Sequence, residues 1–169
     1  PVTVAREHLR SSAGRPRYLL VNTGNANAGT GPAGIEAALA CTRMVANAGK
    51  VPAELVLPFS TGVIGEPLPI QRLEAAIPAA FAALSADGWA DAALGIMTTD
   101  TRPKGCSLRF HADGSDFVVT GIAKGAGMIR PNMATMLAYI ATDMAVDGAV
   151  LQPMLAAAVE CTFNRITID

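Results

Sequence analysis

KGAGMIRPNMATMLAYI, residues 124–140, joins a stretch rich in glycine and interrupted by proline to a mostly apolar run. Glycine and proline are typical of loops, whereas residues 136–140 have the apolar character of a buried strand. The pattern therefore predicts a loop that leads into a strand. Thr135 lies at the junction, and because its side chain is branched at Cβ, its hydroxyl has few rotamers in which to point.

A threonine at such a junction can be a nucleophile, or merely a residue that favours a strand. A hydroxyl is a weak nucleophile unless a base removes its proton, and the α-amine of an N-terminal threonine is one such base. Thr135 would become N-terminal if its hydroxyl attacked the preceding carbonyl, which the small side chain of Ala134 leaves accessible, and if water then hydrolysed the resulting ester. The released amine, with a pKa of about 8, would be partly unprotonated at neutral pH.

Composition and charge argue against several classes of protein. The chain has 169 residues, the size of one domain that can bury a substantial core, and its net charge of −1 offers no basic surface for nucleic acid or an acidic membrane. No apolar run approaches the roughly 20 residues of a membrane span, and no export leader is visible. We therefore expect a soluble, cytoplasmic protein with no nucleic-acid or membrane partner.

The cysteines and histidines are too widely separated to suggest a disulfide framework or a metal site. Cys41, Cys106 and Cys161 are odd in number, and we interpret them as buried structural thiols in a reducing compartment. His8 and His111 have no Cys, Asp or Glu partner at ligand spacing, so we expect no metal and place both histidines at the surface or in a strand.

The hydrophobic pattern predicts a mixed α/β fold in which helices and sheets are layered. Strands are expected after Thr135 and over residues 17–21, 55–57, 107–111 and 116–123, the last two joined by an Asp-Gly hairpin at residues 112–115. Helices are expected from Pro32 to Gly49 and over residues 73–84, 90–97 and 149–161. Pro78 should kink or split the second of these helices. The expected apolar faces of the first two helices are Ile35, Leu39, Met44 and Val45, and Leu73, Ile77, Phe81 and Leu84.

Residues 124–140 resemble, without interruption, the self-cleavage segment of the ornithine acetyltransferase family, the glutamate N-acetyltransferases of arginine biosynthesis. Four further segments resemble the same family in the same order, namely NTGNANA at 22–28, STGVIG at 60–65, MTTDTRPK at 97–104 and FNRITID at 163–169. The resemblance therefore covers nearly all of the chain. It implies the layered helices and sheets of self-processing enzymes whose nucleophile is an N-terminal residue.

The family resemblance also implies a precursor that cuts itself between Ala134 and Thr135. Residues 1–134 would then be most of the upstream α-chain part, and residues 135–169 the truncated start of the β-chain part. Thr135 would take the acetyl group of N2-acetylornithine and pass it to glutamate, which makes the implied enzyme an acyltransferase. The resemblance implies no resident cofactor, acetyl-CoA as a second acetyl donor in some members, and a heterotetramer of α and β chains.

Site residues follow from the same resemblance. Thr61 and Gly62 would form the oxyanion hole, the first through its hydroxyl and the second through its backbone N–H. Thr98, Lys124 and Thr135 would contact substrate. From the residues alone, an ordinary strand-to-loop turn is the favoured interpretation of residues 60–62, and Lys124 would usually be a solvated charge. Residues 22–30 lack the lysine of a phosphate loop, so we interpret their glycines and asparagines as a structural turn near the active centre.

Two other functions remain open. A related self-processing aminopeptidase or amidohydrolase would share the N-terminal nucleophile, and an inactive truncated domain would act only as a scaffold. Members of the resembled family are longer, and the polar groups that they place after the nucleophile have no counterpart in this sequence. We therefore expect the chain to be a fragment, or to be completed by another chain.

Overall fold

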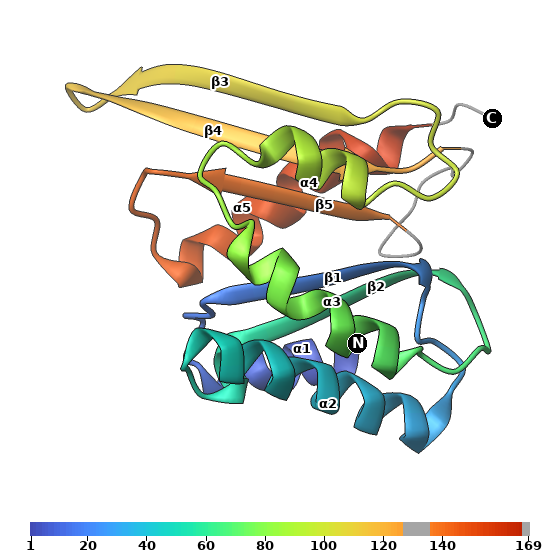
Figure 1. Ribbon diagram of the computed structural model, residues 1–169. Helices are drawn as coiled ribbons and strands as arrows, with labels where there is room; N and C mark the ends of the chain where they lie inside the picture. Colours follow the sequence, from blue (N-terminus) through green and yellow to red (C-terminus); the bar gives the residue numbers. More distant parts are fainter. Residues whose placement is uncertain (127–135, 167–169) are drawn as a thin grey trace. The chain divides into compact units, whose positions relative to one another are not determined.

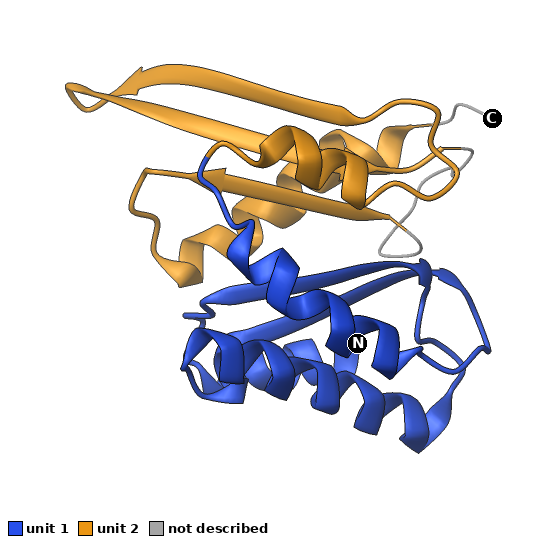
Figure 2. Ribbon diagram, viewed as in Figure 1, with its two compact units in different colours: residues 1–86 blue, residues 87–169 orange. Residues whose placement is uncertain are grey.

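The computed structural model describes residues 1–126 and 136–166, which form two compact units, Pro1–Ala86 and Asp87–Asp169 (Figure 2). Each unit contains its own sheet of hydrogen-bonded strands, although the length of the chain is that of one domain. The predicted division of the chain between Ala134 and Thr135 stays a prediction. Both residues lie outside the described residues.

Pro1–Ala86 packs three helices around a pair of strands (Figure 1). Its elements in chain order are α1 (Val2–Ser11), β1 (Tyr18–Asn25), α2 (Gly31–Gly49), the 3-10 turn η1 (Ala53–Leu55), β2 (Val56–Val63) and α3 (Ile70–Ala82). The two strands are parallel, and parallel strands need a crossover, which here contains α2. The strands predicted at 17–21 and 55–57 are confirmed, although both extend further, to Asn25 and Val63.

Helix α2 begins and ends as predicted but buries a different face. Ile35 is 43% exposed, so its assignment to the buried face is wrong, and Leu39 is only partly buried. The buried residues of α2 are mostly small, namely Gly34, Ala37, Ala38, Cys41, Thr42, Val45 and Ala46. Small side chains let a helix approach its neighbours closely, and α2 contacts both strands and α3. Hydrophobicity alone underrates such residues, which is why the large apolar ones seemed to mark the core.

Helix α3 runs without a break from Ile70 to Ala82 although it contains Pro78. The prediction that Pro78 splits this segment is therefore wrong. A proline removes one backbone N–H, and the remaining hydrogen bonds of the helix are sufficient here. Ile77 is buried against Val45 and Val56, as expected of the apolar face, whereas Leu84 lies beyond the helix and is 64% exposed, contrary to the prediction.

Asp87–Asp169 is built on a three-stranded antiparallel sheet in the order β3-β4-β5 (Figure 1). Its elements are α4 (Trp89–Gly95), β3 (Lys104–Ala112), β4 (Ser115–Lys124), β5 (Leu137–Thr142), α5 (Gly148–Cys161) and the 3-10 turn η2 (Phe163–Arg165). The predicted hairpin is confirmed, because Ala112 pairs with Ser115 across a two-residue loop in which Asp113 and Gly114 have φ angles of 48° and 76°. Helix α4 contacts β3 and β4.

The strand expected after Thr135 is β5, which pairs with β4 so that Leu137 lies opposite Lys124. The prediction that this strand is buried is wrong, because no residue of β5 is fully buried and Ile140 is 55% exposed. The predicted nucleophile therefore comes two residues before a strand whose partner ends at the predicted substrate-binding lysine. This pairing brings the beginning of β5 to the end of β4 although residues 125–136 separate Lys124 from Leu137 in the sequence. Thr135 itself lies outside the described residues.

The cysteines and one histidine differ from the predictions. Cys41 is buried in α2, as expected, but Cys106 and Cys161 are exposed, so their assignment as buried thiols is wrong; all three, which lie within the described ranges, are free thiols. His8 is buried in α1, where its Nδ1 lies 2.8 Å from the carbonyl oxygen of Val56. His111 is exposed on β3, as predicted, beside Asp116 of β4. Within residues 1–126 and 136–166, no helix is long and apolar enough to cross a membrane.

Candidate active site

Thr61 and Gly62 lie in the last residues of β2, directly beside β1. In the parallel register, Thr61 is opposite Thr23 and Gly62 is opposite Gly24. Thr61 is buried, whereas Gly62 is at the surface of its unit. The interpretation of residues 60–62 as an ordinary turn is wrong, because Thr61 and Gly62 belong to strand β2.

Gly62 occupies a position that excludes any side chain. Its φ is +136°, and a Cβ added to it would lie 2.3 Å from the carbonyl carbon of Gly24 and 2.5 Å from the backbone nitrogen of Asn25. Only glycine lets the two backbones approach this closely. The close approach fixes the position of the Gly62 backbone relative to β1, which is a requirement for a backbone N–H that must meet a reacting atom.

Asparagine side chains hold the chain beyond β1 and tie it to β2 and to the loop that follows β2. The Asn22 side-chain amide donates to the Asn25 carbonyl at 2.8 Å, and its oxygen accepts from the Ser60 hydroxyl at 2.6 Å. Asn25 donates to the carbonyls of Glu66 and Pro67 at 3.1 and 3.0 Å. Its side-chain oxygen accepts from the backbone N–H of Asn27 at 2.8 Å, and Asn27 in turn donates to Gly34. The contacts support a structural role for these asparagines, but the interpretation of residues 22–28 as a turn is wrong for residues 22–25, which belong to strand β1.

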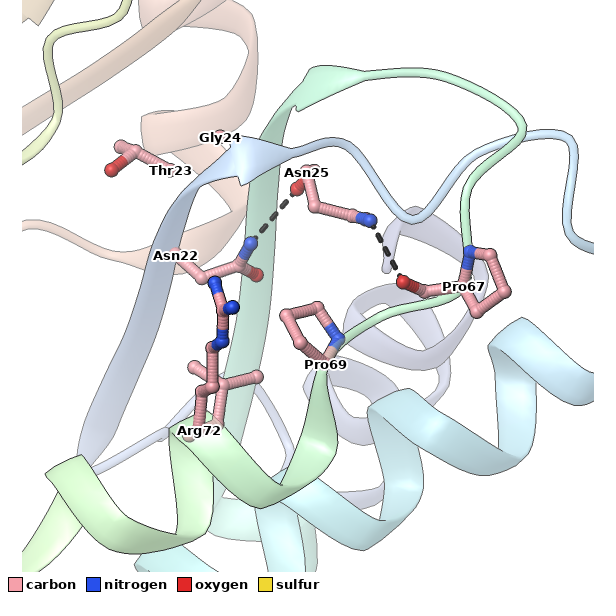
Figure 3. Close-up of a pocket in the computed structure, with 8 residues that line it drawn as sticks. Asn22, Thr23, Gly24, Asn25, Pro67, Pro69 and Arg72 are labelled. Atoms are coloured by element: carbon pink, nitrogen blue, oxygen red, sulfur yellow. Dashed lines mark hydrogen bonds between the residues drawn. The ribbon is translucent and has the colours of Figure 1, made fainter.

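A cavity of about 520 Å³ opens at this end of β1 (Figure 3). Its lining comes from the end of β1, the loop before α3 and the first turn of α3, and consists of Asn22, Thr23, Gly24, Asn25, Pro67, Pro69, Arg72 and Leu73. The guanidinium of Arg72 extends toward Asn22 in Figure 3, whereas the Asn22 and Asn25 carboxamides point to the partners described above. The lining residues Thr23 and Gly24 are the register partners of Thr61 and Gly62, but the side-chain amides of Asn22 and Asn25 are already engaged by the hydrogen bonds described above.

Thr98 and Lys124 come together in the second unit, as their shared predicted role requires. Thr98 lies in the segment between α4 and β3 and is exposed, whereas Lys124 ends β4 and is 4% exposed. The Lys124 Nζ lies 3.4 Å from the Thr98 hydroxyl oxygen. Burial lowers the pKa of the Lys124 ammonium, and the negative charge of Asp100 partly opposes this change.

Asp100 is a central residue of this cluster that the sequence did not single out. Its side chain is fully buried and accepts hydrogen bonds from Lys104 Nζ at 2.5 Å, from the Gly125 N–H at 2.7 Å and from the Thr98 N–H at 3.4 Å. Burial raises the pKa of Asp100, but these hydrogen bonds and the charge of Lys104 together outweigh burial and leave the pKa below its usual value. The available sequence signal was the Asp100-to-Lys104 spacing within residues 97–104.

The remaining predicted site residues, Ala134 and Thr135, lie outside the described residues. The predicted oxyanion pair belongs to the unit Pro1–Ala86, and the predicted substrate contacts Thr98 and Lys124 belong to Asp87–Asp169. In the described part of the chain, no three His, Cys, Asp or Glu side chains gather as they would around a metal ion.

Comparison with known proteins gives the family of this chain. A sequence model of the ArgJ family matches residues 1–169, the whole chain. The chain belongs to the ArgJ family. It is 58% identical over 169 residues to the arginine biosynthesis bifunctional protein ArgJ of Methylococcus capsulatus, and 56% identical to the protein of the same name from Pseudomonas syringae pv. tomato. These alignments cover 100% of the chain but 41% of each ArgJ relative, so the chain spans about two fifths of their length.

Solved ArgJ structures share the fold. The bifunctional protein ArgJ of Bacillus halodurans matches with a TM-score of 0.70 and 33% identity, over 81% of this chain and 70% of that one. The ornithine acetyltransferase of Mycobacterium tuberculosis, solved in complex with ornithine, matches with a TM-score of 0.62 and 30% identity, over 83% of this chain and 70% of that one. The resemblance to the ornithine acetyltransferase family and the mixed α/β fold class, both predicted from the sequence, are confirmed.

Proposed function

We propose that this chain is part of a glutamate N-acetyltransferase that moves an acetyl group from N2-acetylornithine to glutamate. Its ArgJ relatives are named for arginine biosynthesis, and the Mycobacterium tuberculosis relative is an ornithine acetyltransferase solved with ornithine. The observation on this chain that carries the proposal is the buried Lys124 ammonium beside the exposed Thr98 hydroxyl.

A buried ammonium group requires a partner that replaces its lost hydration. The Thr98 hydroxyl supplies one oxygen, and a substrate carboxylate would supply a charge-assisted hydrogen bond, which is stronger than a neutral one. N2-acetylornithine and glutamate both carry an α-carboxylate. The same Lys124 can therefore serve the donor and the acceptor in turn, which suits a reaction in which they occupy one site successively.

The reaction proceeds through two displacements. The Thr135 hydroxyl oxygen attacks the acetyl carbonyl of N2-acetylornithine, the amide C–N bond breaks, and the released amine of ornithine takes the proton. The amine of glutamate then attacks the acetyl ester, the bond to the Thr135 oxygen breaks, and that oxygen regains a proton. The base is the α-amine that Thr135 acquires when the precursor cuts itself after Ala134.

Thr61 and Gly62 have the chemistry needed to stabilise the oxyanion that forms in both displacements and in self-cleavage. One oxyanion donor contributes about 3 kcal/mol to lowering such a barrier. The Gly62 backbone is held by its close approach to Gly24, so its N–H is pre-oriented, and Thr61 is shielded from water, which strengthens a hydrogen bond from its hydroxyl. These features support the oxyanion role over a purely structural one.

Several further properties belong to the same proposal. The relatives are called bifunctional, which supports a second activity, and we assign to it acetyl-CoA as an alternative acetyl donor with no resident cofactor. The pieces upstream and downstream of Thr135 remain associated and pair into a heterotetramer. The three free thiols support a reducing compartment, which agrees with action in the cytoplasm.

The proposal is tested on the polypeptide as its cell produces it, with any residues encoded outside 1–169. Mass spectrometry should find two pieces, the second beginning at Thr135, and incubation with N2-acetylornithine and glutamate should yield ornithine and N-acetylglutamate. Thr135→Ala should prevent both cleavage and transfer, whereas Thr135→Ser should retain part of each. Release of acetate without acetylated glutamate would identify a hydrolase instead, and an intact chain in fully active protein would exclude the N-terminal nucleophile.

A further inference from the structure

Asp100 is the only buried acidic residue among those that the structure describes. A buried carboxylate is costly unless it is paired and hydrogen-bonded, and its partners therefore indicate what it is there to hold. The partners of Asp100 come from three places, the Thr98 backbone, the start of β3 at Lys104, and the Gly125 backbone just after β4. One carboxylate thus joins segments that are far apart in the sequence.

Two of these three partners are next to or part of the proposed substrate contacts. Thr98 donates its backbone N–H to Asp100 while its hydroxyl meets Lys124. Gly125 directly follows Lys124, so the bond from its N–H holds the backbone at the residue that follows β4. Asp100 therefore holds the backbone on both sides of the contact between Thr98 and Lys124.

The two lysines near Asp100 have different environments. Lys104 makes the direct ion pair with Asp100, and its side chain is 49% exposed. Lys124 is 4% exposed and directs its ammonium to the Thr98 hydroxyl. Since Lys104 neutralises Asp100, the cluster of one carboxylate and two lysines keeps one positive charge, which is located at Lys124. A cluster of this charge is suited to an incoming carboxylate.

We propose that Asp100 is a positioning residue, which holds Thr98 and Lys124 in place for the substrate carboxylate and anchors Gly125 for self-cleavage. The inference rests on the acetyl transfer proposed above, but it assigns Asp100 no contact with the reacting atoms. Its two effects are separable, because the anchor on Gly125 needs only an acceptor oxygen, whereas the arrangement of the two lysines needs the negative charge.

Two substitutions in the complete polypeptide separate these effects. Asp100→Ala removes the acceptor and the charge, so self-cleavage should slow by about 10-fold or more, as expected for a lost hydrogen bond to a charged group, and the KM for N2-acetylornithine should rise. Asp100→Asn keeps an acceptor for Gly125, so it should cleave at nearly the normal rate. Its KM should still rise several-fold, because without the carboxylate the two lysine ammonium groups repel each other and displace Lys124. Asp116→Asn, at an exposed aspartate of the same unit outside this cluster, is the matched control and should leave the KM and the cleavage rate near those of the unaltered protein.

Kinetic constants are expressed per mole of Thr135 that can be acetylated, counted by mass spectrometry, so that a partly unfolded sample does not imitate a catalytic defect. A role that holds substrate should raise KM with little change in kcat, because the contacts act on ground state and transition state alike. An Asp100→Asn protein with unchanged KM, or one that cleaves as slowly as Asp100→Ala, would overturn the proposal. So would an Asp100→Ala protein that loses thermal stability but keeps normal KM, kcat and cleavage.

The activities of the unaltered protein distinguish a failure of this inference from a failure of the proposed function. If the unaltered protein cleaves itself but transfers no acetyl group, the acetyltransferase proposal fails, and the cleavage rates of Asp100→Asn and Asp100→Ala still decide the anchoring of Gly125. If the unaltered protein does both and the Asp100 variants match it, the acetyltransferase proposal stands and the role of Asp100 is refuted.

Discussion

Replacement of Gly62 by alanine should be far more damaging than replacement of its near neighbour Gly65. Both residues have positive φ angles, +136° and +84°, which cost a residue with a Cβ about 1–3 kcal/mol. The surroundings differ. A Cβ on Gly62 would lie 2.3 Å from a backbone carbon of Gly24, whereas one on Gly65 would meet nothing within 4 Å. Backbone cannot move aside as a side chain can, so overpacking adds roughly 1–3 kcal/mol for Gly62 alone.

The assay is urea unfolding of Gly62→Ala and Gly65→Ala in the same polypeptide. The strained φ affects both variants, so the difference between their unfolding free energies isolates the clash with Gly24. We expect Gly62→Ala to be less stable than Gly65→Ala by roughly 1–3 kcal/mol, a large fraction of the 5–15 kcal/mol of a typical domain. Because alanine keeps the backbone N–H, any loss of self-cleavage in folded Gly62→Ala would come from displacement of that N–H. Equal stability of the two variants would refute the close approach of β1 and β2.

Three further outcomes are expected. Thr61→Ala should slow both self-cleavage and acetyl transfer by up to about 100-fold, although the precursor should still mature over long incubation. The control is Thr23→Ala, because Thr23 is the register partner of Thr61 on β1, and it should leave both rates nearly unchanged. Equal effects in the two variants would refute the oxyanion role of Thr61. Lys124→Met should raise the KM for the amino-acid substrate with less effect on kcat, and an unchanged KM would take Lys124 out of the site. Because the pKa of Asp100 is lowered from 3.8, its charged form stabilises the fold above pH 3.8, and this contribution is lost as pH falls through the lowered pKa. The difference in unfolding free energy between the unaltered protein and Asp100→Asn, measured in urea, should therefore disappear in acid.

Local sequence signals were sufficient where the structure depends on neighbours in the chain. The Asp-Gly pair at residues 113 and 114 predicted the hairpin because a two-residue turn requires positive φ at both positions. Helix α2 was predicted from Pro32 at its start and Gly49 at its end. Its buried face was not, because packing against β1, β2 and α3 favours alanine and cysteine over the larger Ile35. That preference depends on the distance between elements, which no local pattern contains.

The candidate site shows the same contrast between features that local sequence signals predict and features that depend on packing between distant elements. Residues 60–62 and Lys124 were found because they belong to recognisable segments, but the reason for the glycine became visible only when β2 was placed beside Gly24. Asp100 was missed because an aspartate in a polar segment before proline is normally exposed. Its burial depends on the Gly125 N–H, which is distant in sequence, and on the pairing of β3 with β4, which brings Lys104 opposite Ala123 and so next to the end of β4. A sequence motif identifies the residues that meet substrate, whereas the residue that holds them is identified by the hydrogen bonds that converge on it.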